Sequence, residues 1–214
     1  METFAEVLII LVVLTNLKLL GSSRATACIR TVAAQGVLLA ALPLVTSGDA
    51  ITLRMIAQAL VSGTLKAFVL PFLLLRATRG ARAGRELAPF VGYTTSILLG
   101  VALMPLALAL GRKLGVTGPA GADLLAPAAL FTLLVGLLII VCRKQAVTLV
   151  VGYLAMENGI YAMGLAFAQR EPLLVEMGIL LDVFAAVFVM GLVARHIHRE
   201  FDTLDTDRLS SLKG

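Results

Sequence analysis

Apolar runs of about twenty residues recur along the whole chain, separated mostly by short polar connections. A run of this length matches an α-helix that crosses the hydrocarbon core of a bilayer. The alternation of apolar and polar residues that is typical of a membrane β-barrel is absent from the sequence. The pattern predicts an all-α, polytopic membrane protein with about seven spans, at residues 3–20, 26–46, 52–76, 88–111, 122–142, 145–169 and 172–196.

The composition agrees with this pattern, since 59% of the 214 residues are hydrophobic and only 14% are charged. A soluble domain needs a larger polar surface than that. The formal net charge of +5 does not indicate a nucleic-acid partner, because basic residues of membrane proteins gather in the loops of one side. Thirteen Lys and Arg residues flank one side of the predicted spans and four flank the other. The N-terminus is therefore expected outside and the C-terminus in the cytoplasm.

The connection at 112–121 is rich in Gly and Pro, whereas the spans that follow it are joined closely. We therefore expect an N-terminal four-helix membrane part at 1–111 and a three-helix membrane unit at 122–198. The remaining residues, 199–214, form a polar cytoplasmic tail in this prediction.

Three ionisable residues fall near the centres of predicted spans: Lys66, Glu157 and Asp182. A charged group at the centre of a membrane helix costs about 2.5–3.5 kcal/mol on insertion scales. One explanation is structural, namely that the lysine pairs with a carboxylate and locks helices together. The other is a proton path, because burial favours the neutral forms of both groups and lets them exchange protons.

Further candidates surround these residues. Tyr153 and Tyr161 lie one turn on either side of Glu157, where their hydroxyl groups extend a hydrogen-bonded chain or simply pack. Glu176 lies about 240° around the helix from Asp182, so we expect it to form a secondary, shallower station.

The local sequence also predicts unusual helix geometry near the charges. Pro71 removes a backbone hydrogen bond five residues after Lys66 and should kink that span. The carbonyl group of Ala67 would then lie near the lysine without its usual partner. Ala155 and Gly159 form a pair of small residues that lets another helix backbone approach Glu157 closely.

Other polar residues are weaker candidates. Gln35 and Gln58 are single amides inside helices, which usually form hydrogen bonds between helices. His196 and His198 follow the last span and serve either as a point where protons enter or as interfacial residues. The sequence has no nucleotide-binding, hydrolytic or haem-attachment motif, so we expect no catalytic residue, metal or cofactor on this chain.

Three stretches carry a resemblance to a known family: GYLAMENG (152–159), LLVEMGILLD (173–182) and TLDTDRLSSLKG (203–214). With them, the chain resembles component E of hydrogenase-4, from the formate hydrogenlyase family of membrane-bound nickel–iron hydrogenases. The length and the number of spans match along the whole chain.

The last three spans are also similar to the K-type subunit of complex I and to the C-type subunit of multi-subunit cation/proton antiporters. That family has a glutamate of the proton route in its second helix and another in its third. The first of these aligns with Leu154, and Glu157 follows one turn later on nearly the same face. The second corresponds by depth to Asp182, with Glu176 as the other possible match.

The resemblance implies a non-catalytic membrane-arm subunit in the bacterial inner membrane, coupling electron transfer to the movement of protons or sodium ions. Its neighbours would be a complex-I-like channel subunit, antiporter-like subunits and lipid, with the hydrogenase peripheral arm as an indirect partner. The nickel–iron centre and the iron–sulfur clusters would be on other chains. The alternatives are a purely structural scaffold for antiporter-like subunits and an autonomous carrier of a small solute.

Overall fold

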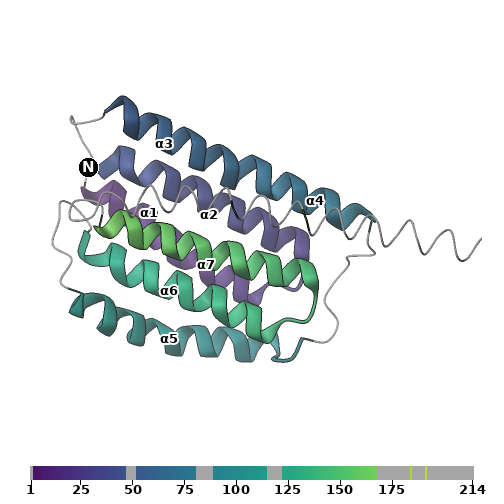
Figure 1. Ribbon diagram of the computed structural model, residues 1–214. Helices are drawn as coiled ribbons and strands as arrows, with labels where there is room; N and C mark the ends of the chain where they lie inside the picture. Colours follow the sequence, from purple (N-terminus) through teal and green to yellow (C-terminus); the bar gives the residue numbers. More distant parts are fainter. Residues whose placement is uncertain are drawn as a thin grey trace, which may run out of the picture.

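The computed structural model describes residues 2–46, 52–80, 89–114 and 122–167, together with residues 184 and 191. Helices follow one another along these ranges (Figure 1). They are α1 (Glu2–Gly21), α2 (Ala25–Thr46), α3 (Leu53–Thr64), the π-helical turn η1 (Leu65–Val69), α4 (Leu70–Gly80), α5 (Tyr93–Lys113), α6 (Ala122–Cys142) and α7 (Ala146–Phe167).

Six helical segments of the described ranges are long and apolar enough to cross a membrane. One of them, Ile56–Arg76, runs through α3, η1 and α4, which follow one another without interruption. The all-α, polytopic prediction is thus confirmed for six of the predicted spans. The seventh, at 172–196, lies outside the described residues apart from two isolated helical positions.

The predicted span at 88–111 begins later than expected, because α5 starts at Tyr93. Gly92 is the residue before the helix, and the backbone N–H of Phe90 donates a hydrogen bond to the carbonyl oxygen of Cys142 at 3.0 Å. The chain before α5 therefore lies against the end of α6 instead of continuing the helix. Its apolar residues do not reveal this in the sequence.

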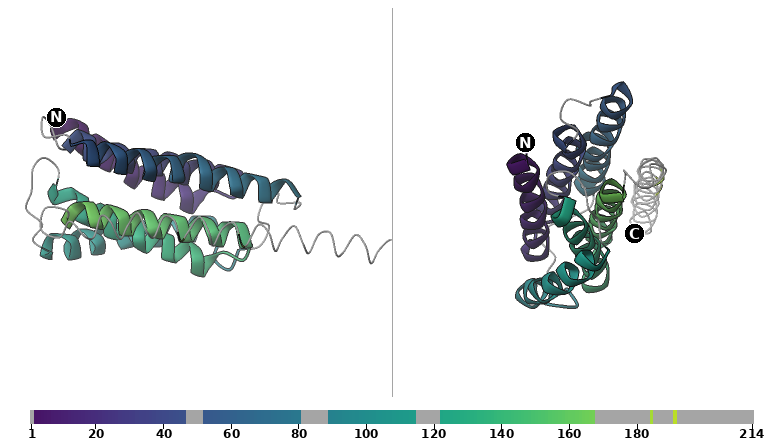
Figure 2. Two further views of the ribbon diagram at one scale, coloured as in Figure 1. Left: turned by 45° about the horizontal axis from the view of Figure 1, so that its top comes forward. Right: turned by 90° about the vertical axis from the view of Figure 1, so that its left-hand side faces the viewer.

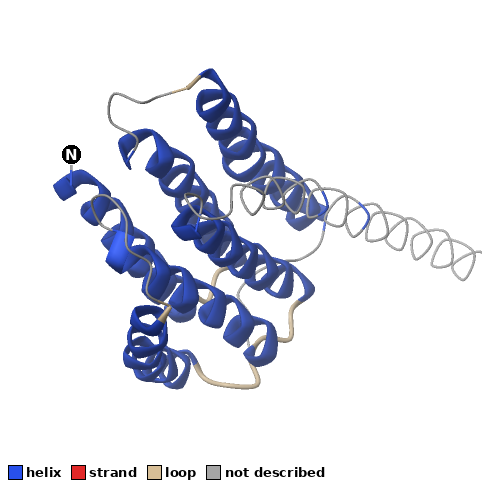
Figure 3. Cartoon of the chain, turned by 60° about the vertical axis from the view of Figure 1, so that its left-hand side comes forward, coloured by secondary structure: helices blue, strands red, loops and turns tan. Residues whose placement is uncertain are grey.

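The helices form two layers (Figure 2). One layer contains α1, α2 and the continuous segment α3–η1–α4, and the other contains α5, α6 and α7. The layers meet where α1 packs on α5 and α6 and where α2 packs on α7. The described residues contain no β-strand (Figure 3). The domain boundary at 112–121 stays a prediction.

Glycine residues bring α6 and α7 into close backbone contact. A Cβ atom added to Gly159 would lie 2.5 Å from the backbone nitrogen of Leu133, and one added to Gly136 would meet the backbone of Met156. Such contacts between small residues replace the hydrophobic effect as a source of helix association in lipid. The close approach predicted beside Glu157 is therefore confirmed, and α6 is the helix that makes it.

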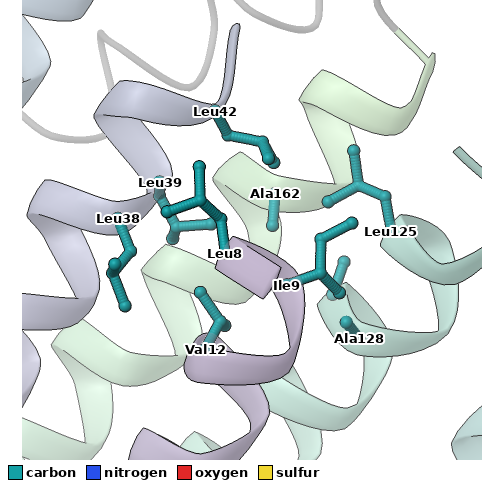
Figure 4. A pocket seen from close by; sticks show the side chains of 10 residues that line it. Leu8, Ile9, Val12, Leu38, Leu39, Leu42, Leu125, Ala128 and Ala162 are labelled. Atoms are coloured by element: carbon teal, nitrogen blue, oxygen red, sulfur yellow. The ribbon is translucent and has the colours of Figure 1, made fainter. Parts of the chain in front are cut away.

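The buried apolar side chains form two clusters at different depths of the bundle. The first cluster includes Leu20, Phe131, Val135 and Leu154. The second cluster includes Ile9, Leu39, Leu125 and Ala162, and it surrounds a small pocket between α1, α2, α6 and α7 (Figure 4). Only apolar side chains line this pocket, so a water molecule would find no side-chain partner there.

Candidate functional site in the middle of the helix bundle

Lys66 lies in the π-helical turn η1, and only 4% of its surface is exposed. In this turn the backbone N–H of Leu70 bonds to the carbonyl oxygen of Leu65, five residues earlier. Pro71 has no N–H group, and its ring would collide with the carbonyl four residues before it in a regular α-helix. A wider turn relieves that collision, and π-helical turns are often found at functional sites. The predicted distortion of this span is confirmed, and it takes the form of a π-helical turn.

The ammonium group of Lys66 faces α7, where it meets three different groups. Lys66 Nζ donates a hydrogen bond to Asn158 Oδ1 at 3.0 Å and lies 3.5 Å from Glu157 Oε1. It also lies 4.7 Å from the centre of the Tyr161 ring. A cation at that distance from an aromatic ring is attracted by the negative face of the ring. The amide contact is the shortest of the three and the carboxylate contact is at the upper limit for a hydrogen bond.

A series of amide side chains continues from Lys66 across the bundle. Asn158 Nδ2 donates to Gln35 Oε1 at 3.1 Å, and Gln35 Nε2 donates to Asn16 Oδ1 at 2.9 Å. Asn16 Nδ2 in turn donates to Thr132 Oγ1 at 2.8 Å. We call Asn158, Gln35 and Asn16 the amide chain. It links η1 through α7, α2 and α1 to α6, so that side chains from five elements meet.

Every member of this arrangement is buried. Lys66, Glu157, Asn158, Gln35, Asn16 and Thr132 are each at most 4% exposed. We call these six residues the polar layer, because they lie between the first and second apolar clusters. Buried polar groups are tolerated when their hydrogen bonds are satisfied. The hydrogen bonds that run from Lys66 through the amide chain to Thr132 meet that condition for the amide groups.

The polar layer can hold a charge in a place that apolar clusters shield from bulk water. Of its members only Lys66 and Glu157 are ionisable, and amides and a threonine hydroxyl do not change charge at ordinary pH. Among the described residues there is no group of three or more His, Cys, Asp or Glu side chains that could hold a metal ion. An ionisable pair beside neutral amides can support proton exchange and charge stabilisation.

The structure brings together three of the predicted site residues, Lys66, Glu157 and Tyr161. Tyr153 is half-buried and packs against the first apolar cluster. Asp182 and Glu176 lie outside the described residues, as do His196 and His198, so their roles stay predictions.

Sequence reasoning missed Asn16, Thr132 and Asn158 as members of the site. It treated Gln35 as a simple interhelical contact, which is confirmed, but Gln35 lies at the centre of the amide chain. A signal was present, because Asn16 and Gln35 both interrupt apolar runs and a buried amide needs partners. The partners depend on which helices pack against each other, and this cannot be predicted from the sequence.

Fold and site together define a multi-pass, all-α membrane protein with a charged pair buried in its centre. A family model described as NADH-ubiquinone/plastoquinone oxidoreductase chain 4L matches residues 124–214. The uncharacterized protein Rv0085 of Mycobacterium tuberculosis is 35% identical over 188 residues, which cover 87% of this chain and 86% of the relative. Hydrogenase-4 component E of Escherichia coli K12 and that of Shigella flexneri are each 46% identical over 81 residues, or 38% of each chain.

The chain therefore belongs to the hydrogenase-4 component E family, and its C-terminal part is of the chain 4L type. The family resemblance inferred from the motifs is confirmed. The match to hydrogenase-4 component E covers 38% of that protein and 38% of this chain, so it applies to only part of each sequence. No solved structure matches the chain.

Proposed function

We propose that the chain is a non-catalytic membrane subunit of a complex-I-like, group 4 hydrogenase in the bacterial inner membrane. Two similarities support this proposal, since one relative is a component of a hydrogenase and the matching family model describes a chain of a quinone oxidoreductase. The expected neighbours are antiporter-like subunits and a complex-I-like channel subunit. The nickel–iron centre and the iron–sulfur clusters belong to partner subunits in this proposal.

Within that complex, the buried pair contributes to a path for protons or sodium ions that is coupled to electron transfer. The observation that carries this proposal is the 3.5 Å contact between Lys66 Nζ and Glu157 Oε1, with both side chains at most 3% exposed. An intramembrane charge is expensive, and such residues commonly mark ion pathways. Asp182 and Glu176 would continue the path, with Tyr161 beside the pair and Tyr153 one turn away.

The test is Glu157→Gln in the assembled complex, which removes the ionisable group and keeps the size of the side chain. Ion translocation in membrane vesicles should fall at least about tenfold, a factor that corresponds to a free-energy difference of about 1.4 kcal/mol. The complex should still assemble. Glu6→Gln is the matched control, because Glu6 is exposed at the start of α1. Unchanged hydrogenase turnover and unchanged translocation in Glu157→Gln would overturn the proposed path.

A second function, a scaffold for antiporter-like subunits, is favoured by one observation. The two charges pair with each other, and the polar layer fastens α1, α2, η1, α6 and α7 together. The double variant Lys66→Met with Glu157→Gln separates the two functions. A scaffold should keep both assembly and translocation, because replacing both partners of a buried pair leaves no unpaired charge. A path should lose translocation in assembled complexes.

A further inference from the structure

We infer that the turn between α6 and α7 binds the phosphate group of an anionic phospholipid, held by Arg143 and Lys144. This site is separate from the polar layer, and it does not depend on the proposed ion path. It lies at the end of the bundle opposite the N-terminus (Figure 1), where α1 and α6 end and α5 and α7 begin. A buried donor, a helix terminus, the distribution of charge and the exposed apolar side chains carry the argument.

The first observation is a buried guanidinium group with an unused donor. Arg143 is 3% exposed, and its Nη2 atom donates to the carbonyl oxygen of Leu20. The other terminal nitrogen, Nη1, is buried as well and has no hydrogen-bond partner within the described structure. A buried charged donor without an acceptor is costly, and a bound ion commonly satisfies such a group. The oxygens of a phosphate are strong acceptors for a guanidinium group.

The second observation is the helix N-terminus beside this group. The guanidinium carbon of Arg143 lies 4.2 Å from the ring centre of Tyr93, which is the first residue of α5. Gly92, the residue before the helix, provides no side-chain cap, and the first turn of α5 has no acidic residue. The first N–H groups of a helix lack partners within the helix and favour a negative charge nearby. Arg143 and the start of α5 therefore attract an anion to the same place.

The third observation is the distribution of charge in the described ranges. Cations gather at this end of the bundle: Lys18, Arg24, Arg30, Arg76, Arg143 and Lys144. The acidic residues of the described ranges lie at the start of α1, at the start of α6 and in the middle of α7, namely Glu2, Glu6, Asp123 and Glu157. No carboxylate of the described part of the chain is therefore available at this end to pair with Arg143.

Exposed apolar side chains next to the turn favour a phospholipid over a free anion. Val141 is 67% exposed and Leu137, one turn earlier on α6, is 46% exposed. Phe90 is 69% exposed, and it lies against the end of α6 through the bond from its N–H group to the carbonyl oxygen of Cys142. The ring centre of Phe90 is 4.4 Å from Lys144 Nζ, so a cation and an apolar surface adjoin. A phospholipid matches both, with its phosphate at the turn and an acyl chain along α6.

The two basic residues have different roles in this site. Lys144 is exposed and meets the headgroup at the surface, together with Thr94 and Thr95 in the exposed first turn of α5. Arg143 lies beneath this rim and supplies the planar group that suits a phosphate. Because Nη1 is covered, binding requires a small movement of the rim that brings a phosphate oxygen to it.

The first experiment measures lipid binding by the full-length chain in detergent. Native mass spectrometry compares phosphatidylglycerol with phosphatidylcholine of the same acyl chains, whose headgroup has no net charge. Phosphatidylglycerol should bind at least about tenfold more tightly, as expected for charge-assisted hydrogen bonds. Equal affinities would overturn the inference and leave an acidic side chain of a neighbouring subunit as the partner of Arg143. Displacement of the lipid by inorganic phosphate, at matched ionic strength, would assign the site to the free anion and overturn the lipid.

The second experiment tests the two residues with substitutions. Lys144→Gln should weaken phosphatidylglycerol binding about tenfold, whereas Lys144→Arg should stay within about twofold of the unaltered chain. Lys18→Gln is the matched control, because Lys18 is an exposed cation in the last turn of α1 at the same end. Its effect should be less than about twofold, since isolated surface charges contribute little. Equal losses in Lys144→Gln and Lys18→Gln would show a general attraction between charges and would overturn the site.

The third experiment locates the bound lipid without any substitution. Phosphatidylglycerol with a photoactivatable group in its headgroup should crosslink to peptides that contain residues 141–145 or 90–95. Crosslinks that occur only at other parts of the chain would overturn the inference. The same measurement on Arg143→Met, made well below its unfolding temperature, should show a loss of these crosslinks, and crosslinks at full yield would exclude Arg143 from the site.

Discussion

Gly36 of α2 lies so close to Lys66 of η1 that a Cβ atom added at residue 36 would be 2.6 Å from the Cβ atom of Lys66. The absence of a side chain at Gly36 is therefore what allows the π-helical turn to rest on α2. This contact sets the depth and the direction from which the lysine reaches α7. It connects the packing of two helices to the geometry of the charged pair.

Gly36→Ala should displace η1 from α2 and lengthen the contact between Lys66 and Asn158. Overpacking of this kind destabilises a protein by about 1–3 kcal/mol, and translocation by the complex should fall several-fold. Thermal unfolding in detergent and vesicle translocation assays measure the two effects.

Gly63→Ala is the matched control for this prediction, because Gly63 belongs to α3 and also packs against α2. Its added Cβ would lie 3.1 Å from the Cβ of Ala40, a contact that a small shift relieves. Equal losses in the two variants would show that the approach of η1 to α2 has no special role.

The bond between Gln35 and Asn16 provides a test of the amide chain as a stabilising element. Asn16→Leu leaves the NH₂ group of Gln35 without one of its acceptors, and Gln35→Met leaves Asn16 without a donor. Each single change should destabilise the protein by about 1 kcal/mol, the usual scale for a hydrogen bond. The double variant should lose less than the sum of the two by about 0.6 kcal/mol, the average coupling found between membrane helices. A double-mutant cycle on thermal unfolding measures this coupling, and strict additivity would contradict it.

The helices of this protein could be predicted from sequence because lipid leaves few alternatives. A span must satisfy its backbone hydrogen bonds internally, so an apolar run of sufficient length becomes a helix. For this reason the predicted span at 122–142 coincides with α6. The start of α5 could not be predicted in the same way, because the apolar residue Phe90 pairs its backbone with Cys142 instead of joining the helix.

The site was only partly predictable, and the reason is again physical. Lys66 and Glu157 are conspicuous because charge is expensive in lipid, and opposite charges at similar depth suggest a pair. The amides of Asn16 and Gln35 signal only that a buried partner is needed and not which one, since an amide is equally suited to many partners. Their connection to Asn158 follows because α2 packs against both α1 and α7, and that arrangement is a property of tertiary packing.

The two cysteines offer a check on the packing of the helix ends. Cys28 is 4% exposed and Cys142 is 3% exposed, so a thiol reagent has little access to either sulfur. Reaction with a membrane-permeant maleimide should be about tenfold or more slower in the folded protein than after denaturation, since it requires local opening. A cysteine introduced by Val141→Cys, at a position that is 67% exposed, is the control for reagent access. Rapid labelling of the native cysteines in the folded protein would contradict the packing described for α2 and α6.

Arg143, in the turn between α6 and α7, contacts two other helices, α1 and α5. Its Nη2 donates to the carbonyl oxygen of Leu20 at 2.6 Å, and its guanidinium carbon lies 4.2 Å from the centre of the Tyr93 ring. A cation at the C-terminal end of a helix satisfies a free carbonyl and opposes the negative end of the helix dipole. Arg143→Met should therefore destabilise the protein by about 1.5–3 kcal/mol, the range for a hydrogen bond from a charged group.

Arg143→Lys should recover only part of that loss, because a single ammonium group does not reproduce the planar contact with both partners. Lys144→Met is the matched control, since it removes one positive charge from the same turn and has the same effect on membrane orientation. Lys144 is exposed and its contact with Phe90, at 4.4 Å from the ring centre, is worth about 0.5–1 kcal/mol. Thermal unfolding in detergent measures the loss of stability in each of the three variants. Equal destabilisation by Arg143→Met and Lys144→Met would mean that the two residues act only as surface charges, and that α1 and α5 are held at this end by apolar contacts alone.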